Sequence, residues 1–76
     1  MADELKISAG EEINLETGRA LFEDVEKRLK KENTALILDL SGVRNMDSRG
    51  GAWILRIKQL AESLGVRFEY QGETGL

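Results

Sequence analysis

The sequence contains no cysteine and no histidine, and these two absences exclude the most familiar catalytic and metal-binding sites. Without cysteine there can be no disulfide and no thiolate ligand. Without cysteine or histidine, the common pairings of a nucleophile with a base are also missing. Carboxylates alone would have to hold a metal ion, which suits calcium or magnesium better than zinc. We therefore expect a protein that uses no metal and no cofactor.

A long apolar run and an excess of positive charge are also lacking. No apolar stretch approaches the roughly 18 residues that a membrane span needs, and the start, Met1-Ala2-Asp3-Glu4, lacks the basic and apolar regions of a signal peptide. The formal net charge is −3, whereas nucleic-acid binding needs a basic surface that neutralises phosphates. We expect a cytoplasmic protein with no membrane span in this chain and no nucleic-acid partner.

What remains is the composition of a small globular domain. The 76 residues leave room for one domain, which we place at residues 1–76. Hydrophobic residues make up 41% of the chain and charged residues 33%, a balance that argues against global disorder. A chain this short buries a smaller share of its surface than a larger one, so we expect modest stability.

Apolar residues recur with two different periods along the chain. Between 15 and 31, and again between 48 and 64, they return every three or four residues, which indicates amphipathic helices. Shorter alternating or continuous apolar segments indicate strands at about 5–8, 35–41 and 66–70. The order strand, helix, strand, helix, strand predicts an α/β fold with a small, mostly parallel sheet and right-handed crossovers.

The middle strand supplies the expected core. Its apolar residues are nearly continuous, as in a strand covered on both faces. We expect Ile37, Leu38 and Leu40 to be almost fully buried. They should pack against apolar residues that share one face of each helix, namely Val25, Leu29, Ile57 and Leu60. Two helices cover three strands incompletely, so the uncovered face or edge could meet a partner, pair two copies as a homodimer, or adjoin the rest of a longer protein.

Two carboxylates at the end of the middle strand are the candidates for catalysis. Asp39 and Asp47 could lie near each other, and paired carboxylates can do acid–base work or hold magnesium. The interpretation we favour is that Asp39 accepts hydrogen bonds within its loop and Asp47 caps a helix. Gly50-Gly51 forms neither GxGxxG nor a Walker loop. A small carboxylate-based hydrolase or a nucleotide-binding domain is therefore the disfavoured alternative.

The segment from Asn45 to Gly51 is the most informative, because it opens the second helix after a buried strand. Asp47 or Ser48 could cap that helix, a role worth about 1 kcal/mol. Ser48 could also be a phosphorylation switch at an interaction surface, since a phosphate adds roughly −1.5 to −2 charges and suits a helix N-terminus. The two roles are compatible, and from the residues alone capping is the simpler interpretation.

The stretch from Leu36 to Gly50 resembles the central signature of STAS domains, the sulfate transporter and anti-sigma factor antagonist fold. In that family an apolar strand ending in Asp-Leu, here Asp39-Leu40, leads through a short loop to Asp-Ser-x-Gly at a helix start, here Asp47 to Gly50. The residues 13–17 resemble the loop before the family's first helix. The resemblance covers nearly the whole chain and implies a STAS fold, truncated at both ends, because the family's first strand and its last strand and helix are missing.

The resemblance also implies a function without catalysis. In members that antagonise anti-sigma factors, the serine at the position of Ser48 is phosphorylated by a partner kinase. Another branch serves ABC transporters that move phospholipids, and Gly51-Ala52-Trp53 is similar to that branch. We expect a protein-interaction and regulatory module, not an enzyme, associated with a Mla-type phospholipid-transport ABC permease at the cytoplasmic face of the inner membrane. The alternative is a phospho-switched anti-sigma factor antagonist, whose partner is the anti-sigma factor or kinase.

The same resemblance supplies the candidate site. We expect the partner interface to include Asp47, Ser48, Arg49, Gly50 and Trp53, with Ser48 as the switch and Asp39 as a structural loop residue. Arg49 departs from the family pattern, because a small residue is usual there. Trp53 shares a helical stripe with Ile57 and Leu60, which favours a place in the core. The alternative is a partly exposed anchor for a partner.

Overall fold

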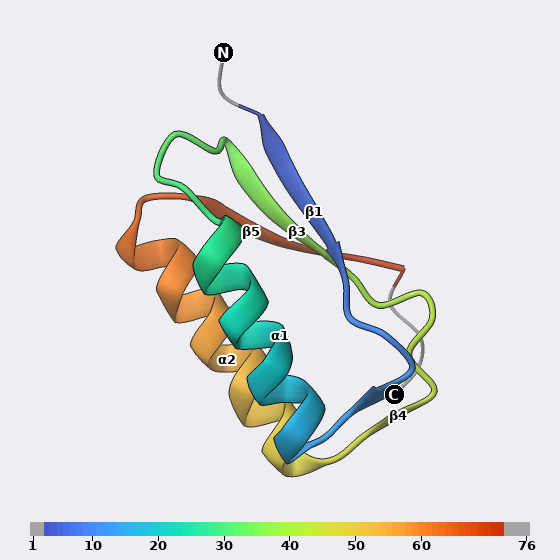
Figure 1. Cartoon of the computed structure of the whole chain (residues 1–76). Helices are drawn as coiled ribbons and strands as arrows, with labels where there is room; N and C mark the ends of the chain where they lie inside the picture. The colour runs from blue at the N-terminus through green and yellow to red at the C-terminus, as the bar shows by residue number, and fades with distance from the viewer. Residues whose placement is uncertain (1–2, 73–76) are drawn as a thin grey trace.

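A parallel sheet of three strands carries two helices on one of its faces in the computed structural model, which describes residues 3–72 (Figure 1). The strands lie in the order β1-β3-β5, and all pair in parallel. The elements of this layer pair are β1 (Glu4–Ser8), α1 (Leu15–Arg28), β3 (Ala35–Asp39), α2 (Ser48–Ser63) and β5 (Arg67–Gln71). The predicted α/β class is therefore confirmed.

Helix α1 has a reciprocal cap at its start. The side-chain oxygen of Asn14 accepts hydrogen bonds from the backbone N–H groups of Glu16 (2.9 Å) and Thr17 (3.0 Å), and the Thr17 hydroxyl accepts one from the N–H of Asn14 (2.9 Å). This capping box satisfies N–H groups that have no partner within the helix. The helix ends at Arg28, short of the expected 31, and Asn33 accepts a hydrogen bond from the N–H of Lys30 (2.8 Å) in the turn that follows.

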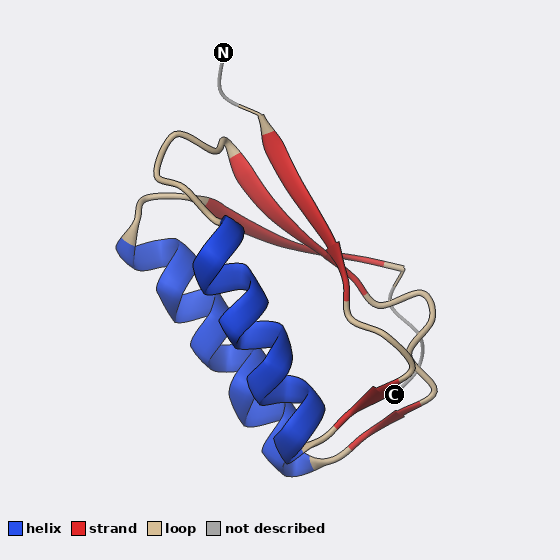
Figure 2. Cartoon of the chain, viewed as in Figure 1, coloured by secondary structure: helices blue, strands red, loops and turns tan. Residues whose placement is uncertain are grey.

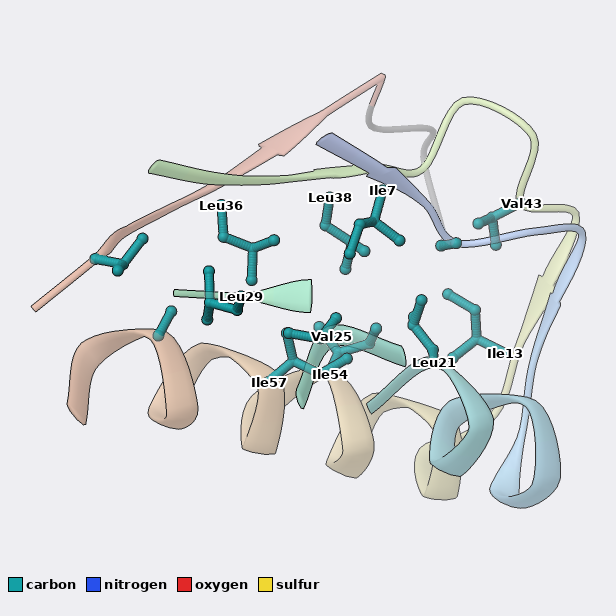
Figure 3. Close-up of a cluster of buried hydrophobic side chains, with 13 residues drawn as sticks. Ile7, Ile13, Leu21, Val25, Leu29, Leu36, Leu38, Val43, Ile54 and Ile57 are labelled. Carbon is teal, nitrogen blue, oxygen red and sulfur yellow. The ribbon is translucent and has the colours of Figure 1, made fainter. Parts of the chain in front are cut away.

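The core lies between the sheet and the helices (Figure 3). Ile7, Leu36 and Leu38 point from the sheet toward Val25 and Ile57 of the helices, and four of these five side chains have no exposed surface. Strands that follow one another across a sheet through right-handed crossovers place their helices on the same face. One apolar layer between sheet and helices is the result, as Figure 2 shows.

The other face of the sheet has no covering helix (Figure 2). Residues alternate between the two faces of a strand, so Ile37 faces away from the core that Leu36 and Leu38 enter. On this face Arg67 forms ion pairs with Glu4 (3.9 Å) and with Glu69 (3.5 Å). Charged side chains of the two outer strands therefore flank an apolar middle strand.

This arrangement corrects two expectations. Ile37 and Leu40, expected to be almost fully buried, are only half-buried. Ile37 is on the face that no helix covers, and Leu40 lies one residue beyond the end of β3. A continuous apolar run is typical of a strand covered on both faces, whereas helices cover only one face of β3.

Two very short strands form a second sheet that the sequence did not predict. Strand β2 (Glu12–Ile13) pairs in parallel with β4 (Asn45–Met46). The pair lies beyond the carboxyl ends of β1 and β3, where each loop turns into its helix (Figure 1). Across residues 3–72, no helix combines the length and the apolar character that crossing a membrane requires.

The core assignment can be tested by truncating Leu38, whose side chain is 0% exposed. We expect Leu38→Ala to lower the free energy of unfolding by about 2–5 kcal/mol, because the change removes buried contacts and leaves a cavity. Leu55→Ala is the matched control, since Leu55 is 54% exposed and its loss should change stability by no more than about 0.5 kcal/mol. Urea denaturation followed by circular dichroism measures both; equal effects would contradict the assignment.

Candidate functional site

The small sheet holds the N-terminal ends of the two helices side by side, as Figure 1 shows. The N–H of Arg44 donates a hydrogen bond to the carbonyl of Glu11 (2.7 Å), and the N–H of Asp47 donates one to the carbonyl of Ile13 (3.1 Å). The two segments that resemble the STAS pattern, 13–17 and 47–50, therefore meet in space.

Asp47 is the residue that caps α2. Its carboxylate accepts a hydrogen bond from the N–H of Gly50 (2.8 Å), and its carbonyl accepts the first helical bond from the N–H of Gly51 (3.0 Å). Ser48 is the first residue of the helix; it is exposed, and its hydroxyl forms no hydrogen bond within residues 3–72. Of the two candidate caps, Asp47 is therefore the one that caps α2, and the Ser48 hydroxyl lies on the surface.

Gly50 allows α2 to begin directly against β2. A Cβ atom at this position would lie 2.1 Å from the carbonyl oxygen of Ile13 and 2.7 Å from its Cγ2 atom. Only a residue without a side chain permits so close an approach of a helix to a strand. Gly50 was expected at the partner interface, but it is buried against the protein's own backbone, so its role is packing.

Trp53 lies between the two helices at the edge of the core. A Cβ atom at Gly18 would come within 2.8 Å of the Trp53 Cβ atom, so α1 leaves room for this side chain. The indole packs at a tilt against Phe22, with 5.4 Å between the two ring centroids. The Arg56 guanidinium lies 4.8 Å from the centroid of the indole ring. The core interpretation of Trp53 is wrong: it is half-buried, because it faces α1 and solvent rather than the sheet.

A hollow of about 190 Å³ adjoins the indole, and we call it the notch. Its lining comes from both helices: Leu15, Arg49, Ala52, Trp53 and Arg56. Leu15 begins the apolar repeat of residues 15–31, but it is 48% exposed. Sequence reasoning therefore missed Leu15 and Arg56 as site residues. Leu15 directly follows the Asn14 cap, and that position was the signal that it could lie at the exposed end of the helix.

Asp39 is the last residue of β3, and its carboxylate lies in the turn that follows. Its carboxylate accepts a hydrogen bond from the N–H of Ser41 (2.9 Å). This bond, with the Ser41 hydroxyl and the positive charge of Lys6, lowers the pKa of the Asp39 carboxyl, against a smaller opposing effect of burial. Asp39 and Asp47 thus each accept a hydrogen bond from a backbone N–H group in their own turn. Within residues 3–72, no cluster of three or more carboxylates is placed to hold a metal ion.

Comparison with known proteins identifies the family. The family model described as "Mlab, STAS domain" matches residues 2–76, so this chain belongs to the STAS domain family. STAS domains are in general non-catalytic modules of protein interaction and regulation. The chain matches none of the curated proteins with which it was compared.

A solved structure shares the fold. The structure titled "Crystal Structure Analysis of Mglu" superposes with a TM-score of 0.87 over 99% of this chain, at 19% sequence identity. This chain spans 19% of the length of that structure. At so low an identity the likeness shows the fold alone.

The cap assignment predicts different costs for two adjacent residues. Asp47→Ala should lower the free energy of unfolding by about 0.5–2 kcal/mol, because the Gly50 N–H loses its acceptor. Ser48→Ala should change it by at most about 0.5 kcal/mol, since the exposed hydroxyl has no structural role. Thermal unfolding of the two variants compares them directly; a larger cost for Ser48→Ala would place the cap at Ser48.

The glycine pair predicts changes of opposite sign. Gly50→Ala should destabilise the fold by about 1–3 kcal/mol, because the new methyl group meets the Ile13 backbone. At Gly51 a Cβ atom would have no heavy atom within 4 Å. Gly51→Ala should therefore stabilise the protein by about 0.5–1 kcal/mol through better helix propensity. Urea midpoints of both variants test this, and equal shifts would argue against the close contact.

Proposed function

We propose that this chain is a regulatory protein-binding module whose partner docks on the N-terminal end of α2, and that phosphorylation of Ser48 switches the docking. The observation that carries the proposal is the position of Ser48, exposed at the first residue of α2 in the segment that resembles the family signature. Exposed apolar side chains of Leu15 and Met46 belong to the same junction of loops and helix starts. Exposed apolar groups near a modifiable residue are typical of an interaction surface.

The physical basis of such a switch is local. A phosphate on Ser48 would add roughly −1.5 to −2 charges at the start of a helix. The helix dipole and the free N–H groups there favour negative charge, so the fold would tolerate it. Ala52 and Leu55 follow Ser48 at four- and seven-residue steps, which puts all three on one exposed face of α2. A partner that contacts this face therefore meets Ser48 as well.

The setting that we propose is a phospholipid-transport ABC permease, with the module at the cytoplasmic face of the inner membrane. Gly51-Ala52-Trp53 resembles the branch of the family that serves these transporters. The matched family model, moreover, has "Mlab" in its description. The partner would then be a transporter subunit.

One residue favours a second candidate, an anti-sigma factor antagonist. The transporter branch often has threonine at the switch position, whereas this chain has Ser48. In that setting the partner would be an anti-sigma factor that also acts as the kinase. The two settings use the same surface, so the identity of the bound protein separates them.

Charge at Ser48 tests the proposal. The tagged full chain is produced in its host as wild type, Ser48→Ala and Ser48→Asp, and the bound proteins are identified by mass spectrometry. We expect Ser48→Asp to weaken binding of the captured partner about tenfold or more, about 1.4 kcal/mol, while its melting temperature stays near that of the wild type. Ser48→Ala is the control for loss of the hydroxyl and should retain binding.

The outcome also decides between the settings. Capture of an ABC transporter subunit by the wild type supports the permease, and capture of a kinase-like anti-sigma factor supports the antagonist. Equal affinity of all three forms for the same partner would contradict a role for Ser48 in docking.

A further inference from the structure

The notch beside Trp53 combines an apolar floor with a cationic rim, on a chain whose net charge is −3. We infer that the notch receives one bulky apolar side chain from an acidic segment of a protein partner. The inference rests on the proposed function, because it states the chemistry of the partner that docks at the start of α2. It goes further by naming the residues that select that partner.

The floor of the notch is suited to an anchoring side chain. The indole of Trp53, the methyl of Ala52 and the half-exposed Leu15 provide apolar surface from two helices. A volume of about 190 Å³ lies below the roughly 300–1,000 Å³ of small-molecule sites. A single side chain therefore fits better than a metabolite. Interfaces often depend on one such anchor in a pocket, surrounded by polar contacts.

The rim supplies charge that the protein itself leaves uncompensated. Neither Arg49 nor Arg56 forms an ion pair within residues 3–72, whereas Arg19, Arg28 and Arg67 each have a carboxylate partner. The guanidinium of Arg56, which lines the notch, lies 4.8 Å from the centroid of the indole ring, a distance at which a cation–π interaction is favourable. Guanidinium groups bind carboxylates through paired hydrogen bonds. The rim therefore favours Asp or Glu beside the anchor.

The charge around Arg49 also gives the partner an orientation. A second hollow shares Leu15 and Arg49 with the notch and is also lined by Glu16 and Asp47. A carboxylate placed there would meet like charges, whereas one placed near Arg56 would not. We therefore expect that the acidic residues of the partner lie on the side of the partner's apolar anchor that faces Arg56. Ser48 directly follows Asp47 in the chain, so a phosphate on Ser48 would add negative charge next to Asp47 and would add to the repulsion.

Peptides selected on the full-length chain provide the experiment. A random peptide library displayed on phage is selected against the wild-type protein, and the enriched peptides are synthesised. We expect one bulky apolar residue flanked by Asp or Glu in these peptides. Trp53 is the sole tryptophan of the chain, so with an enriched peptide that contains no tryptophan a change in emission on titration reports binding at or near the notch.

Two charge reversals on the same helix supply the matched comparison. Arg56→Glu and Lys58→Glu make the same change in net charge, and both side chains are exposed, but only Arg56 lines the notch. We expect Arg56→Glu to weaken binding of an enriched peptide about tenfold or more and Lys58→Glu to leave it nearly unchanged. Arg49→Glu is a second variant at the rim and should weaken binding likewise. Melting temperatures confirm that each variant is folded.

Three results would overturn the inference: enriched peptides without acidic residues, equal weakening by Arg56→Glu and Lys58→Glu, or a change of Trp53 emission with phosphatidylglycerol vesicles but not with the peptides. The last would identify an anionic membrane as the occupant.

Ser48→Asp separates this inference from the proposed function. If Ser48→Asp weakens binding of the cellular partner and Arg56→Glu does not, the docking face is right and the chemistry of the notch is wrong. If Arg56→Glu weakens it and Ser48→Asp does not, the notch is right and the switch is wrong.

Discussion

The approach of Gly50 to the backbone of Ile13 is the contact on which the candidate site depends. With a side chain at position 50, α2 could not begin where it does, because the Cβ atom would overlap the Ile13 carbonyl group. The same contact lies beside the hydrogen bond from the Asp47 N–H to the Ile13 carbonyl and the pairing of β2 with β4. Together these interactions bring the start of α1 to the start of α2. Leu15 and Arg49 line one notch because these two helix starts lie side by side.

Helix α2 has one face in the core and one face exposed to solvent, and the proposed docking surface uses the exposed face. Ile54 and Ile57 enter the core between helix and sheet, whereas Ser48, Ala52 and Leu55 lie on the exposed face. A charge added to the exposed face would therefore meet solvent rather than the core, and in the proposed function it would also meet the partner. This division allows a modification to change binding while the fold remains intact, and it suits a module that regulates without catalysing.

Trp53 connects the two faces. Its ring occupies the space that Gly18 leaves open and packs on Phe22, so it contributes to the contact between the helices. Its exposed edge belongs to the notch, where Arg56 lies near the ring. An anchor fixed in this way loses little conformational entropy on binding, which is one reason why tryptophan is common among residues that dominate interfaces.

The fold class could be predicted from the sequence because each element carries its own period. The apolar residues repeat with helical and strand periods in a fixed order along the chain. This order was enough to predict two crossovers and a parallel sheet. Asp47 could be named as one of two candidate caps from its place before an amphipathic segment. The position of Ser48 at the start of a helix followed from the same local pattern.

The burial of single residues could not be predicted in this way. Periodicity tells which face of an element is apolar, but not which layer covers that face. Ile37 faces a side of the sheet without helices, and Leu15 and Trp53 lie at the rim between helices rather than beneath the sheet. Strands β2 and β4 are too short to carry a period and arise only from pairing across the chain. The sequence alone thus determined the elements and their order; the tertiary packing decided which residues form the notch, because the notch exists only where two helix starts meet.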